Sequence, residues 1–201
     1  MEIRDRIKKC AEELFRVYGI RSVTMDEIAL KLGVSKKTIY QSFNDKGELV
    51  DEVTRDILEN NIKLAIASHE QARDAVEELF LAIRAIHTFL TDLNPSVLFD
   101  MQRGYPKTFK RFHDFRFGFL YKMIVDNMRW GKKEGLYREE INEDIYARLR
   151  IEMVSMAFNE QLFPRSGYAL LEIQKQSLSM YMHSLVTPKG KKLIEKYAAK
   201  E

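Results

Sequence analysis

A short run of cationic and hydrogen-bonding residues between positions 36 and 41 carries the clearest chemical signal in the sequence. Side chains spaced i, i+3 and i+4 lie on one face of a helix, and this spacing relates Lys36, Lys37, Tyr40 and Gln41. Ammonium, phenol and carboxamide groups can pair with phosphate oxygens and with the edges of bases. A single helix is about the size that the major groove of DNA admits, so the pattern predicts a nucleic-acid contact.

The residues around this run predict two short helices joined by a tight turn. Thr24 and Glu27 have the spacing of a capping box, which predicts a helix over residues 25–32. Gly33 can adopt the left-handed backbone that reverses the chain, and Ser35 can cap a further helix over residues 36–43. Two short helices with such a turn are typical of a helix-turn-helix.

Apolar residues at matching positions are expected to hold this pair of helices together. We expect the second helix to be anchored through Val34, Ile39 and Phe43, with Ala29 small at the crossing. Their expected partners are Leu14, Phe15 and Ile28. Helix N-termini carry free N–H groups that favour phosphate, and the polar residues at these termini are Thr24, Ser35 and Lys46.

The rest of the chain predicts an all-α fold. Helical periodicity, caps and the four prolines predict further helices over residues 3–18, 45–69, 72–93, 95–103, 106–134, 142–163 and 168–186, with a short one after residue 190. Only 13 residues are glycine or proline, about half the usual share of ~12%, which argues against a sandwich or barrel. Short basic helices give way to long, aromatic and Met-rich ones near residue 50, which predicts domains over 1–50 and 51–201.

Composition excludes several classes of protein. One cysteine excludes a disulfide framework and a multi-Cys metal site, and no apolar run is long enough to span a membrane. The first six residues are not followed by the apolar core of a signal peptide, so we expect a cytoplasmic protein. The net charge of +3 is small, but residues 31–46 alone carry +3, as a docking patch would. The tail from residue 187 also carries +3, for which lysines on solvated helix faces are the plainer explanation.

The ordered motifs of the first fifty residues resemble the DNA-binding domain of the tetracycline-repressor-like (TetR) family. The resemblance rests on Ala11-x-x-Leu14-Phe15-x-x-x-Gly19, Thr24-x-x-x-Ile28-Ala29, Gly33-Val34-Ser35, Thr38-Ile39-Tyr40-x-x-Phe43 and Lys46-x-x-Leu49. It covers about residues 3–50, a quarter of the chain.

The resemblance implies a role for each matching position. The recognition helix would carry Lys36, Lys37, Thr38, Tyr40 and Gln41, of which Lys37, Thr38 and Gln41 are our candidates for reading bases. Tyr40 and Lys46 match positions that contact phosphates, and Thr24 and Ser35 match caps that approach them. Lys37, Ser42 and Gly47 depart from the residues common in the family, so the operator sequence stays open.

The family's C-terminal part is an all-α dimerisation and ligand-sensing domain. The helix expected over residues 106–134 carries aromatic residues on most of its circumference, which predicts that it is central and buried. The plain interpretation of these aromatic residues is core packing. The alternative is an effector pocket lined by Phe99, Met101, Tyr105, Phe112 and Phe119, with His87, Arg103 or His113 orienting the ligand.

Apolar residues on the last two long helices allow two interpretations. Ile145, Leu149, Met153, Met156 and Phe163, followed by Leu171, Leu178, Met182 and Leu185, could form more intramolecular core or a four-helix bundle with a second copy. The resemblance favours the homodimer, and one recognition helix is too little for specific binding.

Together these observations lead us to expect a homodimeric, ligand-responsive transcriptional regulator, most plausibly a repressor, bound to a double-stranded, pseudo-palindromic operator. A DNA-binding or architectural dimer without a small-molecule effector is the alternative. We expect no enzyme, cofactor, metal or membrane association, because the sequence has no glycine-rich phosphate loop, G-x-S-x-G or H-E-x-x-H motif.

Overall fold

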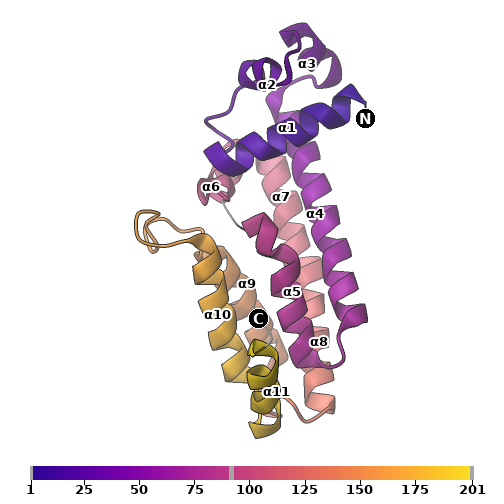
Figure 1. The fold of residues 1–201 in the computed structure, drawn as a ribbon, viewed down its shortest axis with the longest axis vertical. Helices are drawn as coiled ribbons and strands as arrows, with labels where there is room; N and C mark the ends of the chain where they lie inside the picture. Colours follow the sequence, from indigo (N-terminus) through magenta and orange to yellow (C-terminus); the bar gives the residue numbers. More distant parts are fainter. Residues whose placement is uncertain (1, 91–92, 200–201) are drawn as a thin grey trace. The chain divides into compact units, whose positions relative to one another are not determined.

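The computed structural model describes residues 2–90 and 93–199, with the side chains of residues 86, 88 and 89 left out. The described residues form helices, with one isolated antiparallel bridge between Tyr137 and Val186. The all-α prediction is therefore confirmed. The helices, which Figure 1 shows in chain order, are α1 Ile3–Tyr18, α2 Met25–Leu32, α3 Lys36–Ser42, α4 Lys46–Gln71, α5 Ala75–Leu90, α6 Ser96–Gly104, α7 Pro106–Asp114, η1 Phe115–Leu120, α8 Tyr121–Lys133, α9 Glu143–Met156, α10 Leu170–Leu185 and α11 Pro188–Ala198.

The chain divides into two compact units. The first is Met1–Asn60 with Asp92–His113, and the second is Asn61–Thr91 with Asp114–Glu201. The predicted domain boundary at residue 50 falls inside α4 and stays a prediction. Within the described residues, no helix has the length and hydropathy that a bilayer span requires.

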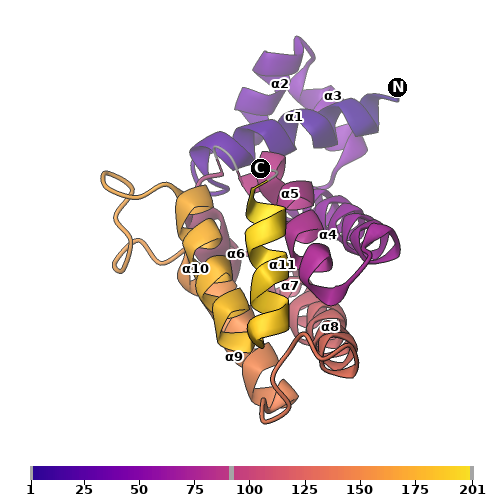
Figure 2. The ribbon, with the colours of Figure 1, turned by 60° about the horizontal axis from the view of Figure 1, so that its bottom comes forward.

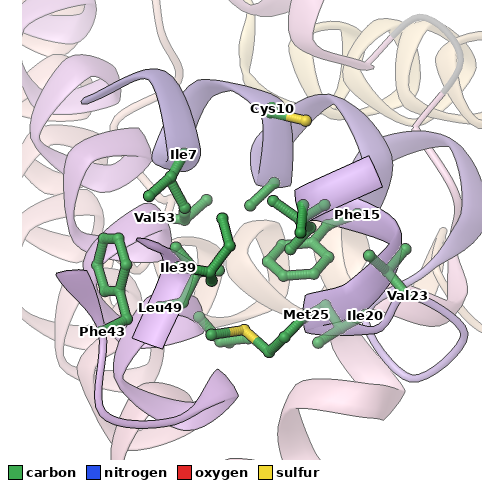
Figure 3. Packing of buried hydrophobic residues seen from close by; sticks show 14 of the residues in the cluster. Ile7, Cys10, Phe15, Ile20, Val23, Met25, Ile39, Phe43, Leu49 and Val53 are labelled. Atoms are coloured by element: carbon green, nitrogen blue, oxygen red, sulfur yellow. The ribbon is translucent and has the colours of Figure 1, made fainter. Parts of the chain in front are cut away.

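The first unit packs α1, α2, α3 and the start of α4 around one apolar core (Figure 3). Ile7, Phe15, Ile28, Ile39 and Phe43 are all at most 5% exposed in this core. The predicted anchors Leu14 and Val34 pack against it and are partly buried. The predicted anchoring of α3 is thus confirmed.

The second unit has its own core, formed by α5, α8, α9, α10 and α11, of which Figure 2 shows α10 and α11 most directly. Tyr137 is 1% exposed at its centre, and a side chain at Gly131 would overlap the Tyr137 ring. The Tyr137 hydroxyl lies 2.9 Å from the Ala75 carbonyl and 3.1 Å from Asn127 Oδ1. This buried tyrosine therefore joins the start of α5 to α8.

The predicted helix over residues 106–134 is present, with two differences. Its middle, Phe115–Leu120, is a π-helix, a geometry that appears as short insertions in α-helices. Its aromatic residues are partly rather than fully buried: Phe109 and Phe112 pack against the core of the first unit, and Tyr121 and Trp130 pack against that of the second. The buried positions are instead Thr108, Arg116, Val125, Asn127, Met128 and Gly131.

Candidate nucleic-acid interface

Local hydrogen bonds set the helix-turn-helix. Thr24 Oγ1 accepts from the Glu27 N–H at 3.2 Å, and Glu27 Oε2 accepts from the Thr24 N–H at 2.6 Å, which completes the predicted capping box. This pairing holds the pKa of Glu27 below its ordinary value, because it stabilises the carboxylate. Helix α2 therefore begins at the position that the sequence predicts.

Gly33 ends α2 in the left-handed conformation, with φ +66°. Its N–H donates to the Leu30 carbonyl and the Val34 N–H donates to the Ala29 carbonyl, both at 3.1 Å. These two bonds form a Schellman motif, which satisfies the last carbonyls of α2 and turns the chain. The turn delivers Ser35 to the start of α3.

Ser35 caps α3 and also engages Thr38. Its Oγ accepts from the Thr38 N–H at 3.1 Å and lies 2.8 Å from Thr38 Oγ1. Both predicted DNA-contacting hydroxyls thus lie together at the N-terminus of α3, where N–H groups favour an anion.

The outer face of α3 is open to solvent while its inner face is closed. Lys36, Lys37, Tyr40 and Gln41 are exposed, and Tyr40 is 44% exposed. Ile39, between them in sequence, is fully buried. The structure therefore brings these four predicted contacts together on one surface.

The cations of this region differ in what they already contact. Lys36 Nζ donates to Asp26 at 2.9 Å, and this exposed pair raises its pKa. Lys37 and Gln41 form no side-chain hydrogen bond or ion pair with any of the residues that the structure describes. Lys37 and Gln41 are therefore the side chains on α3 best able to reach bases without breaking an existing contact.

Lys46 is placed differently from the other predicted DNA contacts. Its Nζ donates to the Ile20 carbonyl at 2.5 Å, and burial lowers its pKa. The ammonium thus supports the α1–α2 loop, and a phosphate contact would require it to leave this carbonyl.

Arg4 is a residue of this site that the sequence did not single out. Its Nη2 lies 2.6 Å from Glu52 Oε1 and 3.1 Å from Glu48 Oε1, both on α4. Its Nη1 donates to the carbonyl of Ser42, the last residue of α3, and the guanidinium lies 4.2 Å from the centre of the Phe43 ring. Arg4 therefore connects the end of α3 to α4. Its only sequence signal is the i, i+4 spacing of two glutamates 44 and 48 positions away.

Residues 93–113 support the same unit from a distant part of the sequence. The Asn94 N–H donates to the Arg16 carbonyl at 2.7 Å, and Asp100 accepts from the Arg21 N–H at 2.9 Å. On α7, Arg111 pairs with the buried Asp51 of α4 at 3.1 Å. Helices α6 and α7 are thus bonded to the α1–α2 loop and to α4 of the first unit.

The predicted effector contacts divide between the two units. Met101 is buried in the first unit, and Tyr105 and Phe112 pack against its core. Arg103 lies over the half-exposed Phe99 ring, 4.7 Å from its centre. His113 belongs to the first unit too, whereas His87 and Phe119 belong to the second. Their role in binding an effector stays a prediction.

Comparison with known proteins gives a consistent result. Residues 7–53 match the model of the bacterial regulatory proteins of the TetR family. The chain is 25% identical over 198 residues to the transcriptional repressor BepR of Brucella suis, with 93% of each chain covered.

Solved structures share the fold. A putative regulator from Saccharomonospora viridis in complex with choline has a TM-score of 0.75 at 20% identity, covering 92% of this chain and 97% of its own. SmeT, the repressor of a Stenotrophomonas maltophilia multidrug efflux pump, has a TM-score of 0.68 at 18% identity, covering 94% and 92%.

Proposed function

Because the chain belongs to the TetR family of bacterial regulatory proteins, we propose that it is a homodimeric repressor that binds a pseudo-palindromic operator and responds to a small molecule. The observation that carries the proposal is the exposed face of α3, which presents Lys36, Lys37, Tyr40 and Gln41 on a buried apolar anchor.

We assign phosphate contacts to Thr24, Ser35, Lys36 and Tyr40, and base contacts to Lys37, Thr38 and Gln41. Gln41 can pair bidentately with adenine and Lys37 can donate to guanine. Lys46 joins the phosphate contacts only if its ammonium leaves the Ile20 carbonyl on binding.

Exposed apolar residues on α9 support a homodimer. Ile145, Leu149 and Met156 are 52%, 56% and 43% exposed and share one helix face. On α10 the exposed apolar residue is Met180, at 63%, whereas Leu178, Met182 and Leu185 lie in the core of the protomer. The bundle with a second copy therefore draws on a different face of α10 from the one that the sequence suggested.

The hydrogen bonds of the first unit support a route for regulation. Helix α4 is bonded to α1 and to the end of α3 through Arg4, and to α7 through Asp51. An effector that displaces α4 or α7 would therefore move α3. A coupling of about 1–3 kcal/mol would change operator affinity about 5–150-fold.

Selection of bound duplexes from a random DNA pool tests the proposal. We expect an enriched inverted repeat whose affinity falls steeply with salt. Salt-sensitive binding without an enriched sequence would support an architectural dimer instead. No binding at any salt concentration would contradict the proposal.

Matched variants refine the test. Lys37→Ala should weaken operator binding and Gln41→Ala should change the preferred base at one half-site position. Lys175→Ala removes the same charge from an exposed position on α10 and should leave binding unchanged. If Lys175→Ala weakens binding as much as Lys37→Ala does, net charge rather than α3 explains the affinity.

A further inference from the structure

Arg150 on α9 is a half-buried cation to which the described residues offer no anionic partner. Its Cζ lies 5.6 Å from the centre of the Tyr181 ring and its Nη1 lies 3.5 Å from Ser177 Oγ, both on α10. In the parts of the chain that the structure describes, no carboxylate pairs with it. Arg148, two positions earlier, is exposed and pairs with Asp144 at 2.9 Å.

The surroundings of Arg150 disfavour an uncompensated charge. Burial lowers its pKa to about 10, because the guanidinium loses water that no carboxylate replaces. The group still carries its charge at neutral pH. A half-buried cation that loses water and gains no carboxylate is a favourable partner for an anion from outside the protomer.

Tyr181, whose ring lies near Arg150, has a hydroxyl donor that is not used. The residue is 4% exposed, and its hydroxyl has no hydrogen-bond partner among the residues described. Buried hydroxyls are almost always paired, so an unpaired one needs an explanation. The centre of the Tyr181 ring lies 5.6 Å from Arg150 Cζ, so an oxyanion that pairs with Arg150 and reaches the hydroxyl would accept from both groups.

Apolar side chains form the cluster that contains Tyr181. Leu178 and Met182 of α10 are buried in the same hydrophobic cluster as Tyr181, and Tyr146 and Met153 of α9 pack against it while partly open to solvent. A cation that borders an apolar cluster through the Tyr181 ring matches a molecule with an acidic head and an apolar body.

We propose that the second unit binds a small amphiphilic carboxylic acid, whose carboxylate pairs with Arg150 and accepts a hydrogen bond from Tyr181. The acid opens the contact between α9 and α10 as it enters, because the Tyr181 hydroxyl is closed to solvent. The proposal rests on the proposed regulator function, in which this acid is the effector. Arg150 is not one of the effector contacts that the sequence suggested.

Calorimetric titration of the full chain with three eight-carbon probes tests the chemical class. Octanoate, octan-1-ol and octyltrimethylammonium share an apolar chain and differ in head charge. We expect octanoate to bind at least about 10-fold more tightly than the other two, since a charge-assisted pair is the stronger contact. Equal binding of all three, or no binding of octanoate, would overturn the proposal.

Variants locate the site. Arg150→Met should weaken octanoate binding at least about 10-fold, and Tyr181→Phe should weaken it less, because it removes one neutral donor. Arg148→Met is the matched control on the same helix and should bind octanoate like the parent. Octanoate binding that survives Arg150→Met would place the acid elsewhere and overturn the assignment.

Thermal unfolding separates a binding role from a structural one. Arg150→Met replaces an uncompensated charge by an apolar chain of similar length, so the unfolding midpoint should stay or rise. A clear fall would make Arg150 a structural residue and contradict the proposal. Operator affinity is measured with and without octanoate. If octanoate binds through Arg150 but operator affinity does not change, the binding site is kept and its role as an effector site is refuted. Failure of operator binding itself would refute the regulator function without affecting the titration.

Discussion

Replacing Arg4 by lysine tests whether the position of α3 depends on α4. The lysine keeps the charge but loses the planar fork that joins Glu52, Glu48 and the Ser42 carbonyl at once. Lysine can keep one ion pair with α4, while the hydrogen bond to α3 and the contact with the Phe43 ring are lost. The change therefore loosens one connection without altering net charge.

The expected magnitude is modest because the Arg4 side chain is 38% exposed and solvent screens its ion pairs. One lost charge-assisted bond and one exposed cation–π contact amount to about 1–2 kcal/mol after this discount. For a chain of this size, the midpoint of thermal unfolding should fall by about 2–8 °C.

Operator affinity should respond more specifically than stability. If Arg4 holds α3 in its reading position, the same free energy corresponds to an operator affinity about 5–30-fold lower. Binding to random-sequence DNA should not change, because it depends on charge, which the lysine preserves. Fluorescence anisotropy with the selected operator and with a scrambled duplex measures both quantities.

Two further variants form the control. Glu52→Gln removes a carboxylate that pairs with Arg4, and Asp56→Asn removes one that pairs with Lys8 at 2.6 Å. Both variants neutralise an acid of α4 that faces α1. Arg4 also bonds to the Ser42 carbonyl of α3, whereas Lys8 bonds to Asp56 of α4. Glu52→Gln should lower the ratio of operator to random-DNA affinity, and Asp56→Asn should not. Equal effects of the two variants, or an unchanged ratio in Arg4→Lys, would refute the reasoning.

Four further predictions concern the interface, the dimer and the two cores. Lys36→Ala should reduce the slope of log affinity against log salt by about 1, measured by anisotropy over a salt series; an unchanged slope would remove Lys36 from the phosphate contacts. Leu149→Asp should place a charge on the exposed face of α9 and yield monomers in sedimentation velocity, with Glu172→Asp on the exposed side of α10 as a control that stays dimeric. Asn127→Leu should lower the free energy of unfolding by about 1–3 kcal/mol, because it removes the buried amide that donates to Glu78 and to the Ala75 carbonyl, which keeps only the Tyr137 hydroxyl; a stability equal to the parent would show that water replaces the amide. Burial raises the pKa of Glu12, so the protonated side chain contributes stability below about pH 4.5, and this stability is lost as the pH rises through the folded-state pKa. Glu12→Gln should therefore raise the midpoint of thermal unfolding at pH 7 and not at pH 4. The opposite pattern would contradict the desolvation argument.

Local signals predicted the helix-turn-helix closely. Helix α2 begins and ends where the Thr24 capping box and Gly33 predict, and α3 begins after its Ser35 cap. Each of these signals is a hydrogen bond or backbone preference between residues fewer than six positions apart. Such interactions form the same way in any fold, so the sequence alone contains them.

Helix ends without a strong local signal were predicted less well. The helix predicted over 142–163 ends at Met156, and the one predicted from 72 begins at Ala75, after the carboxylate of Asp74 accepts the N–H groups of Val76 and Glu77. Apolar periodicity continues beyond the true end in the first case, because it indicates burial and not hydrogen bonding.

The sequence by itself determined the helical class, the two short helices of the candidate interface and the residues that α3 turns outward. Only the tertiary structure decided which cations already have partners. Lys46 supports the α1–α2 loop and Arg4 joins α3 to α4, whereas Lys37 and Arg150 have no carboxylate partner among the described residues. These partners are separated by 26 to 48 positions or come from different helices. The pattern of residue types along the chain indicates helical periodicity and local hydrogen bonds. The partners of a charged group depend instead on how the helices pack in space, and this packing depends on all the residues of the core together.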